Sequence, residues 1–138
     1  MRIPVLFISA LLLTGSAAFA FDDAERREAQ GIVRAQVEAF SHDDAATAFS
    51  YAAPSIRGMF PSPEMFLAMV ANAYAPVYRH RSFEFGDARD DGTTLAQKAR
   101  IVDAGGVPWD ALYTLEKQSD GSWKITGCVL LKAVEQAV

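Results

Sequence analysis

The chain has 138 residues, 51% of them hydrophobic, and a formal net charge of −4 at pH 7. This length allows one compact domain with a buried core and leaves no room for a second domain of ordinary size. The acidic balance, without a visible stripe of Lys and Arg, argues against nucleic acid as a partner.

The first 20 residues, MRIPVLFISALLLTGSAAFA, predict a secretory signal peptide. Arg2 precedes a short apolar run, and Ala18 and Ala20 supply an A-x-A cleavage site. We expect cleavage after Ala20, so that residues 21–138 form a single exported α+β domain with no further membrane contact. The protein is expected in the periplasm if its source is a Gram-negative bacterium, and in the medium otherwise.

Three helices are predicted in the amino-terminal half, because apolar residues recur there at spacings of three and four. Asp22 and Glu25 resemble a capping box at the start of the first helix. Ser62 and Pro63 are a typical cap and first residue for the third. The expected bounds are Asp22–Phe40, Ser41–Pro54 and Ser62–Pro76.

His42, Asp43 and Asp44 stand side by side between the first two predicted helices. They could form a metal or acid–base cluster, or they could only separate the helices. Neighbouring residues on a helix point in different directions, and carboxylates in a first turn pair with its free N–H groups. We therefore interpret the three residues as a helix break, with Ser41 as the cap and Asp44 in the first turn of the second helix.

After residue 76 the hydrophobic period changes to two, which predicts strands. The turns between the strands contain Gly and Asp, as tight hairpins require. Short turns join neighbouring strands antiparallel, so four strands form a meander. The strand-like runs are VYRHRSFEFGD, TLAQKARIVDA, VPWDALYTLEKQ and GSWKITGCVLLK.

Strict alternation predicts one apolar sheet face that the three helices cover and one charged face in water. The apolar face is expected to hold Phe83, Phe85, Trp109, Ala111, Tyr113, Leu115, Trp123, Ile125, Val129 and Leu131. The charged face is expected to hold Glu84, Asp110, Thr114, Glu116, Lys124 and Lys132. The predicted fold is therefore α+β, with three N-terminal helices packed on one face of a curved four-stranded antiparallel meander. The sheet is expected to be curved because a twisted sheet curves.

The segments FLAMV, YAPVYRHRSFEFG and WDALYTLEKQSDGSWKITGCVLL resemble domain-of-unknown-function family 4864 of exported bacterial proteins. The likeness extends from about Ile32 to Leu131. The order of the elements is also similar to the nuclear-transport-factor-2-like and SnoaL-like superfamily, which implies a cone-like, cystatin-like α+β fold. That superfamily frequently uses a pocket between the helices and the hollow sheet face. The resemblance transfers no catalytic residue.

Candidate ligand contacts lie at the start of the first strand and on the apolar face of the sheet. Arg79 and Arg81 could clamp a carboxylate or phosphate, and His80 could act as a base near neutral pH; alternatively, they only form the solvated end of the strand. The aromatic rings could line a pocket for a flat apolar ligand, or could simply fill the core. The predicted pocket lining is Tyr78, His80, Arg81, Phe83, Phe85, Trp109, Tyr113 and Trp123.

We expect a module that binds a small apolar or amphiphilic ligand, or a partner protein, between helices and sheet. One alternative is an isomerase or dehydratase that uses an acid, Asp103 or Asp110, with a tyrosine in this pocket, although turn and surface roles also explain both acids. Another is a structural homodimer whose outer sheet faces pack together. No cofactor is predicted, because the chain lacks nucleotide-binding and nucleophile-elbow motifs. No metal site is predicted either, because His and Cys lack a ligand spacing, and Cys128 is expected to be a buried, inert thiol.

Overall fold

The computed structural model describes residues 20–133, and the predicted signal peptide lies outside this range except for its last residue. Within these residues, five helices come first and four strands follow, which confirms the α+β class. The helices are α1 (Asp23–Ser41), α2 (Ala45–Ser50), α3 (Pro54–Arg57), α4 (Pro63–Ala73) and α5 (Ala75–Tyr78). The strands are β1 (His80–Asp90), β2 (Thr94–Asp103), β3 (Pro108–Lys117) and β4 (Trp123–Lys132).

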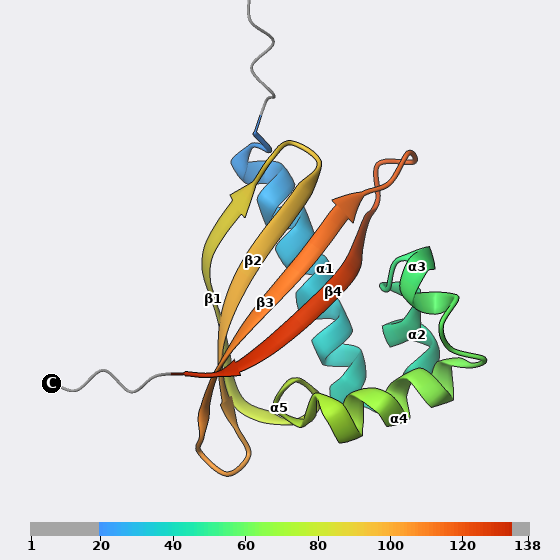
Figure 1. Ribbon diagram of the computed structural model, residues 1–138, viewed down its shortest axis with the longest axis vertical. Helices are drawn as coiled ribbons and strands as arrows, with labels where there is room; N and C mark the ends of the chain where they lie inside the picture. Colours follow the sequence, from blue (N-terminus) through green and yellow to red (C-terminus); the bar gives the residue numbers. More distant parts are fainter. Residues whose placement is uncertain (1–19, 134–138) are drawn as a thin grey trace, which may run out of the picture.

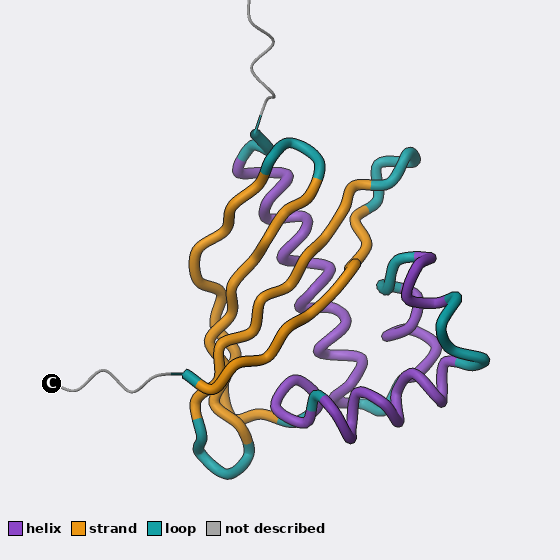
Figure 2. The backbone as a smooth tube through the Cα atoms, viewed as in Figure 1, coloured by secondary structure: helices purple, strands orange, loops and turns teal. Residues whose placement is uncertain are grey.

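The four strands form one antiparallel sheet in the order β1-β2-β3-β4, which confirms the predicted meander (Figure 1). α1 crosses one face of the sheet, and residues 45–78, here called the helical arm, lie beside β4 and the lower half of the sheet (Figure 2). The core lies between α1, the arm and the sheet. Its largest fully buried apolar side chains are Val33, Phe40, Leu95, Ile101, Tyr113 and Leu115. In this part of the chain no helix is long and apolar enough to cross a membrane.

Two short helices, α3 and α5, are missing from the prediction of three helices. Each has four residues, which is too few for a helical period to be recognised. The prediction places Pro54 and Pro76 at helix ends, whereas both lie in the first turn of these short helices. Proline is favoured there because the N–H that it lacks would have no partner within the helix.

The segment from His42 to Asp44 separates α1 from α2, but the cap differs from the predicted one. Asp44 is the N-cap of α2, and its Oδ1 accepts a hydrogen bond from the N–H of Thr47 at 3.2 Å. Ser41 is the last residue of α1, and its hydroxyl donates to the carbonyl of Glu38 at 2.6 Å. The prediction of Ser41 as the cap is therefore wrong. Both residue types are good caps, and the choice depends on where α1 stops.

A β-bulge in β4 changes its pairing with β3. Leu115 pairs with Ile125, but Thr114 pairs with Gly127, so Thr126 is one additional residue in β4. The hydroxyl of Thr126 donates to the hydroxyl of Thr114 at 3.0 Å. A Cβ on Gly127 would lie 3.0 Å from that same Thr114 oxygen. A larger residue at position 127 therefore requires Thr114 to move.

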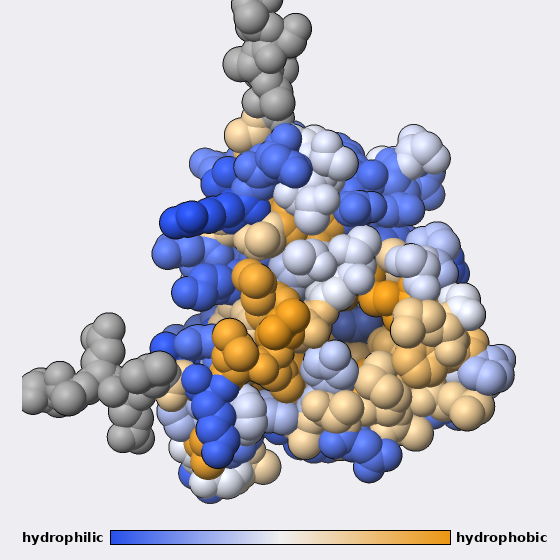
Figure 3. Space-filling model, viewed as in Figure 1, coloured by the Kyte–Doolittle hydropathy of each residue, from blue (hydrophilic) through white to orange (hydrophobic). Residues whose placement is uncertain are grey.

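The bulge reverses the side-chain alternation in the second half of β4, because it inserts one residue into a pattern of period two. Val129 and Leu131 are 55% and 64% exposed, so the prediction that they face the helices is wrong. Together with Leu112 they form an apolar patch on the outer face of the sheet (Figure 3). Cys128 and Leu130 pack against the core in their place. The other eight residues predicted for the inner face belong to the core or pack against it.

Two alanine substitutions in β4 test this register. Ile125→Ala should lower the free energy of unfolding by about 2–5 kcal/mol, because its side chain is buried in the core. Val129→Ala should lower it by less than about 1 kcal/mol, because its side chain is exposed. Urea unfolding of both variants measures the difference, and equal losses would contradict the bulge.

Candidate functional site

A pocket of about 390 Å³ lies between the inner face of the sheet and the helical arm. The sheet contributes Tyr113 and residues 125–128 to its lining, and α1 contributes Gln36 and Phe40. The rest of the lining comes from residues 52–77 of the arm. Figure 3 shows a hollow that opens between the sheet and the helices.

The arm wall of the pocket is organised by an aromatic cluster around Phe66. Ser62 caps α4 as predicted, because its hydroxyl accepts a hydrogen bond from the backbone of the first turn. The helix then presents Phe66 toward the core, where it is buried. Its ring centroid lies 5.3 Å from Phe49, 5.5 Å from Phe60 and 6.1 Å from Phe40. These rings join α1, α2 and α4 around one side of the pocket.

Backbone hydrogen bonds hold the segment between α2 and α3 against β4. The N–H of Ala53 donates to the carbonyl of Ile125 at 2.8 Å. The N–H of Ile125 donates to the carbonyl of Tyr51 at 2.9 Å. β4 is an edge strand, so its outward N–H and C=O groups are free to bind another segment. The arm uses these groups and thereby closes one end of the pocket.

A polar cluster connects the α1–α2 turn to the residues before β1. The guanidinium of Arg79 donates to the carbonyl of Phe40 at 2.7 Å and to Asp43 at 3.1 Å, and the hydroxyl of Tyr78 also donates to Asp43. The hydrogen bond from Tyr78 and that from Arg79 lower the pKa of Asp43. Asp43 therefore stays ionised near neutral pH and is unsuited to donate a proton. The cluster is best explained as a link that positions the arm.

Tyr113, which belongs to the pocket lining, has a buried hydroxyl group without a hydrogen-bond partner in the described part of the chain. Its side chain is 1% exposed, and its Oη makes no hydrogen bond within residues 20–133. Burial, with smaller effects from Cys128, raises the pKa of Tyr113 well above its ordinary value, so the hydroxyl remains protonated and can donate. A buried hydroxyl without a partner destabilises the fold. The other buried polar side chain of the lining, Gln36, donates to the carbonyl of Ala48 at 3.1 Å.

Cys128 lies directly opposite Tyr113 in the ladder between β3 and β4 and also lines the pocket. Burial raises the pKa of its thiol to about 12, and the nearby Tyr113 hydroxyl, which approaches the thiol without the geometry of a hydrogen bond, offsets this only in part. The group is therefore a neutral thiol near pH 7. Because the thiolate is the reactive form, this agrees with the expectation of an inert cysteine.

The pocket lining carries no charge. None of its sixteen residues is Asp, Glu, His, Lys or Arg. The acids considered for isomerase-type chemistry lie elsewhere: Asp103 accepts hydrogen bonds from the N–H groups of Gly105 and Val107 in the β2–β3 turn at 2.9 and 2.8 Å. Asp110 pairs with Arg100 at 2.9 Å. No group of acidic, His or Cys side chains in the described part of the chain could hold a metal ion.

The eight residues predicted to line a pocket are divided among several places. Of these residues, Tyr113 alone lines the larger pocket. His80, Arg81 and Phe83 line a second hollow of about 260 Å³, which they share with α1. Tyr78 belongs to the Asp43 cluster described above.

The remaining three aromatic residues line neither pocket. The ring of Phe85 lies under the guanidinium of Arg34, with 4.9 Å between the guanidinium carbon and the ring centroid. The indole N–H of Trp109 donates to Asp103 at 3.0 Å. Trp123 is buried, and its ring centroid lies 4.7 Å from that of Phe21 in an edge-to-face arrangement.

Sequence reasoning missed the pocket residues of the helical arm. Phe60, Phe66 and Met69 fit an ordinary core equally well, because large apolar residues at helical spacing usually pack inside a domain. The sequence offers no separate signal for them, because the two four-residue helices of this arm are too short for a period to be recognised.

Residues 22–138 match the model of the family described as Domain of unknown function (DUF4864), and the chain belongs to this family. Among solved structures, it is similar to an NTF-2-like protein of unknown function from Silicibacter pomeroyi, with 17% identity and a TM-score of 0.53 over 82% of this chain and 100% of that one. It is also similar to a SEC-C motif containing protein from Rhodopseudomonas palustris, with 15% identity and a TM-score of 0.49 over 73% of this chain and 77% of that one. A search of curated proteins finds no match. The family and NTF-2-like resemblances are thus confirmed, and at this identity the structural likeness concerns the fold alone.

The raised pKa of Cys128 can be tested by alkylation. At pH 8 we expect iodoacetamide to modify Cys128 in the folded protein more than about a hundredfold more slowly than in the urea-unfolded chain, because an ordinary thiol titrates near 8.5. The folded-state rate should rise about tenfold per pH unit up to pH 10. Mass spectrometry follows the modification, and similar rates in folded and unfolded protein would contradict the assignment.

Proposed function

We propose that this domain is exported, to a periplasm or to the medium, and that it binds an uncharged small molecule in the pocket between the sheet and the helical arm. The observation that carries the proposal is a pocket of about 390 Å³ whose lining has no Asp, Glu, His, Lys or Arg. Small-molecule sites have volumes of roughly 300–1,000 Å³ and mostly apolar walls. The volume is within this range and points to a compact ligand.

The chemistry of the walls defines the kind of molecule. A charged group that enters an apolar site loses its hydration and finds no opposite charge here, so carboxylates and phosphates are disfavoured. The hydroxyl of Tyr113 lacks a hydrogen-bond partner within the described residues and can donate to a neutral oxygen. The expected ligand therefore has an apolar body and one carbonyl, ether or hydroxyl oxygen that reaches Tyr113.

The alternatives have less support. Isomerase or dehydratase chemistry needs a general base within reach of the substrate, and the pocket lining offers no Asp, Glu or His. A homodimer through the outer sheet face would use the patch of Leu112, Val129 and Leu131. That face lies opposite the inner face that lines the pocket, so dimerisation would not explain the unfilled space beneath the arm.

Three naphthalene derivatives of similar size test the ligand class. Acetylnaphthalene carries a neutral oxygen, ethylnaphthalene carries none, and naphthoate carries a charge. We expect acetylnaphthalene to bind about tenfold more tightly than ethylnaphthalene, because only its oxygen can accept the hydrogen bond from Tyr113. Naphthoate should bind at least about a hundredfold more weakly than acetylnaphthalene at pH 7. Isothermal titration calorimetry measures all three affinities.

Tyr113→Phe tests whether the Tyr113 hydroxyl causes the difference in affinity between acetylnaphthalene and ethylnaphthalene. The variant should bind acetylnaphthalene and ethylnaphthalene equally, and its free energy of unfolding without ligand should be unchanged or higher by up to about 1 kcal/mol, because an unpaired hydroxyl has been removed. Tyr74→Phe is the matched control, since Tyr74 lines the same pocket, and it should keep the preference. Binding of none of the probes would overturn the proposed function, whereas tighter binding of naphthoate would overturn the ligand class.

A further inference from the structure

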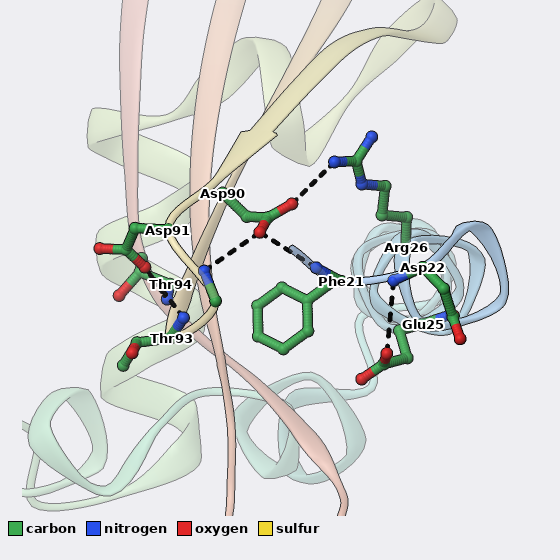
Figure 4. A network of polar contacts seen from close by, with 9 residues as sticks. Phe21, Asp22, Glu25, Arg26, Asp90, Asp91, Thr93 and Thr94 are labelled. Carbon is green, nitrogen blue, oxygen red and sulfur yellow. Dashed lines mark hydrogen bonds and ion pairs between the residues drawn. The ribbon is translucent and has the colours of Figure 1, made fainter. Parts of the chain in front are cut away.

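The carboxylate of Asp90, at the end of β1, receives hydrogen bonds from three donors. Its Oδ1 accepts from the backbone nitrogens of Phe21 and Gly92, each at 3.1 Å. Its Oδ2 accepts from the guanidinium of Arg26 at 2.8 Å. Figure 4 shows Asp90 between Arg26 and the nitrogen of Phe21, and the Asp90 side chain is 0% exposed. A segment before the first helix is thus held by a residue almost 70 positions later.

Phe21 is held from a second side as well. Its ring lies edge-to-face against Trp123, with 4.7 Å between the centroids. Asp22, the next residue, is the N-cap of α1 and forms a capping box with Glu25. The ring of Phe21, its backbone nitrogen and the start of α1 therefore have fixed positions relative to the sheet.

The same nitrogen has a special place in the sequence. Predicted cleavage after Ala20 makes Phe21 the first residue of the mature chain. Hydrolysis of this peptide bond consumes one water, leaves a carboxylate on Ala20, and turns the nitrogen of Phe21 into an ammonium group. The nitrogen that donates one hydrogen bond as an amide then donates as a cation.

We propose that Asp90 is the binding site for the α-ammonium group of the processed chain, so that removal of the signal peptide creates a buried ion pair that the precursor lacks. This proposal depends on the export proposed above and is independent of the ligand pocket. Hydrogen bonds between charged groups are about twice as strong as neutral ones. The processed chain therefore gains stability at the point where β1 meets α1.

Electrostatics around α1 explain why a carboxylate is required here. A positive charge at the amino end of a helix meets the positive end of the helix dipole, which is unfavourable. Asp90 offsets this repulsion. Burial opposes ionisation of Asp90, but the hydrogen bonds from Arg26, Phe21 and Gly92 outweigh it and lower the pKa of Asp90. The carboxylate is therefore ionised when an ammonium group forms beside it.

Two chains with defined amino termini test the ion pair. One begins at Phe21 with a free amine, released from a fusion by a protease that leaves no additional residue; the other has one Gly before Phe21, which restores an amide at this nitrogen. At pH 6 we expect the Tm of the free-amine chain to be about 4 °C higher. Asp90→Asn should abolish the difference between the two chains. Asp87→Asn, at an exposed position of the same strand, should preserve it.

The stability that the free amine adds should depend on pH in a defined direction. The charged groups around the Phe21 nitrogen are Asp90 from β1, Asp22 at the N-cap of α1, Arg26 and Glu25 from α1, and Lys117 from β3, which pairs with Glu25 at 3.1 Å. A carboxylate neighbour favours the charged amine, so the added stability should be complete below the ordinary α-amino pKa of about 8 and should disappear as the pH rises further. Thermal unfolding between pH 6 and pH 10 measures this.

Intact mass spectrometry of the full chain exported from a Gram-negative host tests the processing step. A mature protein that begins at Phe21 supports the proposal, and any other amino terminus overturns it together with the predicted cleavage site. If the protein begins at Phe21 but the free-amine and Gly-extended chains have the same Tm at pH 6, the ion pair is overturned while export stands. If Asp90→Asn does not fold, the Tm difference at pH 6 between the free-amine and Gly-extended chains decides whether the ion pair forms.

Discussion

One additional residue in β4 determines how both faces of the sheet are used. Because Thr126 is inserted between the Leu115–Ile125 and Thr114–Gly127 pairs, residues after it exchange faces. Ile125, before the bulge, faces the core while its backbone binds the helical arm on the open edge of the strand. Residues 126–128 then border the pocket. The segment of β4 around the bulge therefore both binds the helical arm and lines the pocket.

The pocket combines two features that reduce stability at one place. Its walls are mostly apolar and border a hollow that opens at the surface, so apolar area remains exposed to water. The unpartnered hydroxyl of Tyr113 adds an unmade hydrogen bond beside this space. A molecule with an apolar body and one neutral oxygen would remove both defects together. Hydrogen bonds at Asp43 and Ile125 attach the arm to the rest of the domain. These facts support the proposed binding function. An acid–base mechanism is less well supported, because the pocket lining has no Asp, Glu or His.

Asp90 and the pocket act on different parts of the molecule. Asp90 joins the start of α1 to the turn between β1 and β2, whereas the pocket depends on the arm and β4. They share α1, which carries Arg26 near its start and Gln36 and Phe40 of the pocket lining farther along, and Trp123 of β4 packs against Phe21. Processing of the amino terminus and ligand binding can therefore be tested separately, because each depends on residues that the other does not use.

The sequence by itself determined the features that depend on neighbours along the chain. The caps at Asp22 and Ser62 and the hairpin turns follow from local hydrogen bonds and backbone preferences. The order of helices and strands and most of the inner sheet face follow from the hydrophobic period along the chain. Only the tertiary structure decided which face Val129 takes, since a bulge arises from pairing with β3. It also decided that Tyr113, alone among the eight predicted residues, borders the larger pocket, and that Asp90 meets the nitrogen of Phe21. Each of these depends on residues brought together across the fold, and no local pattern in the sequence encodes such distances.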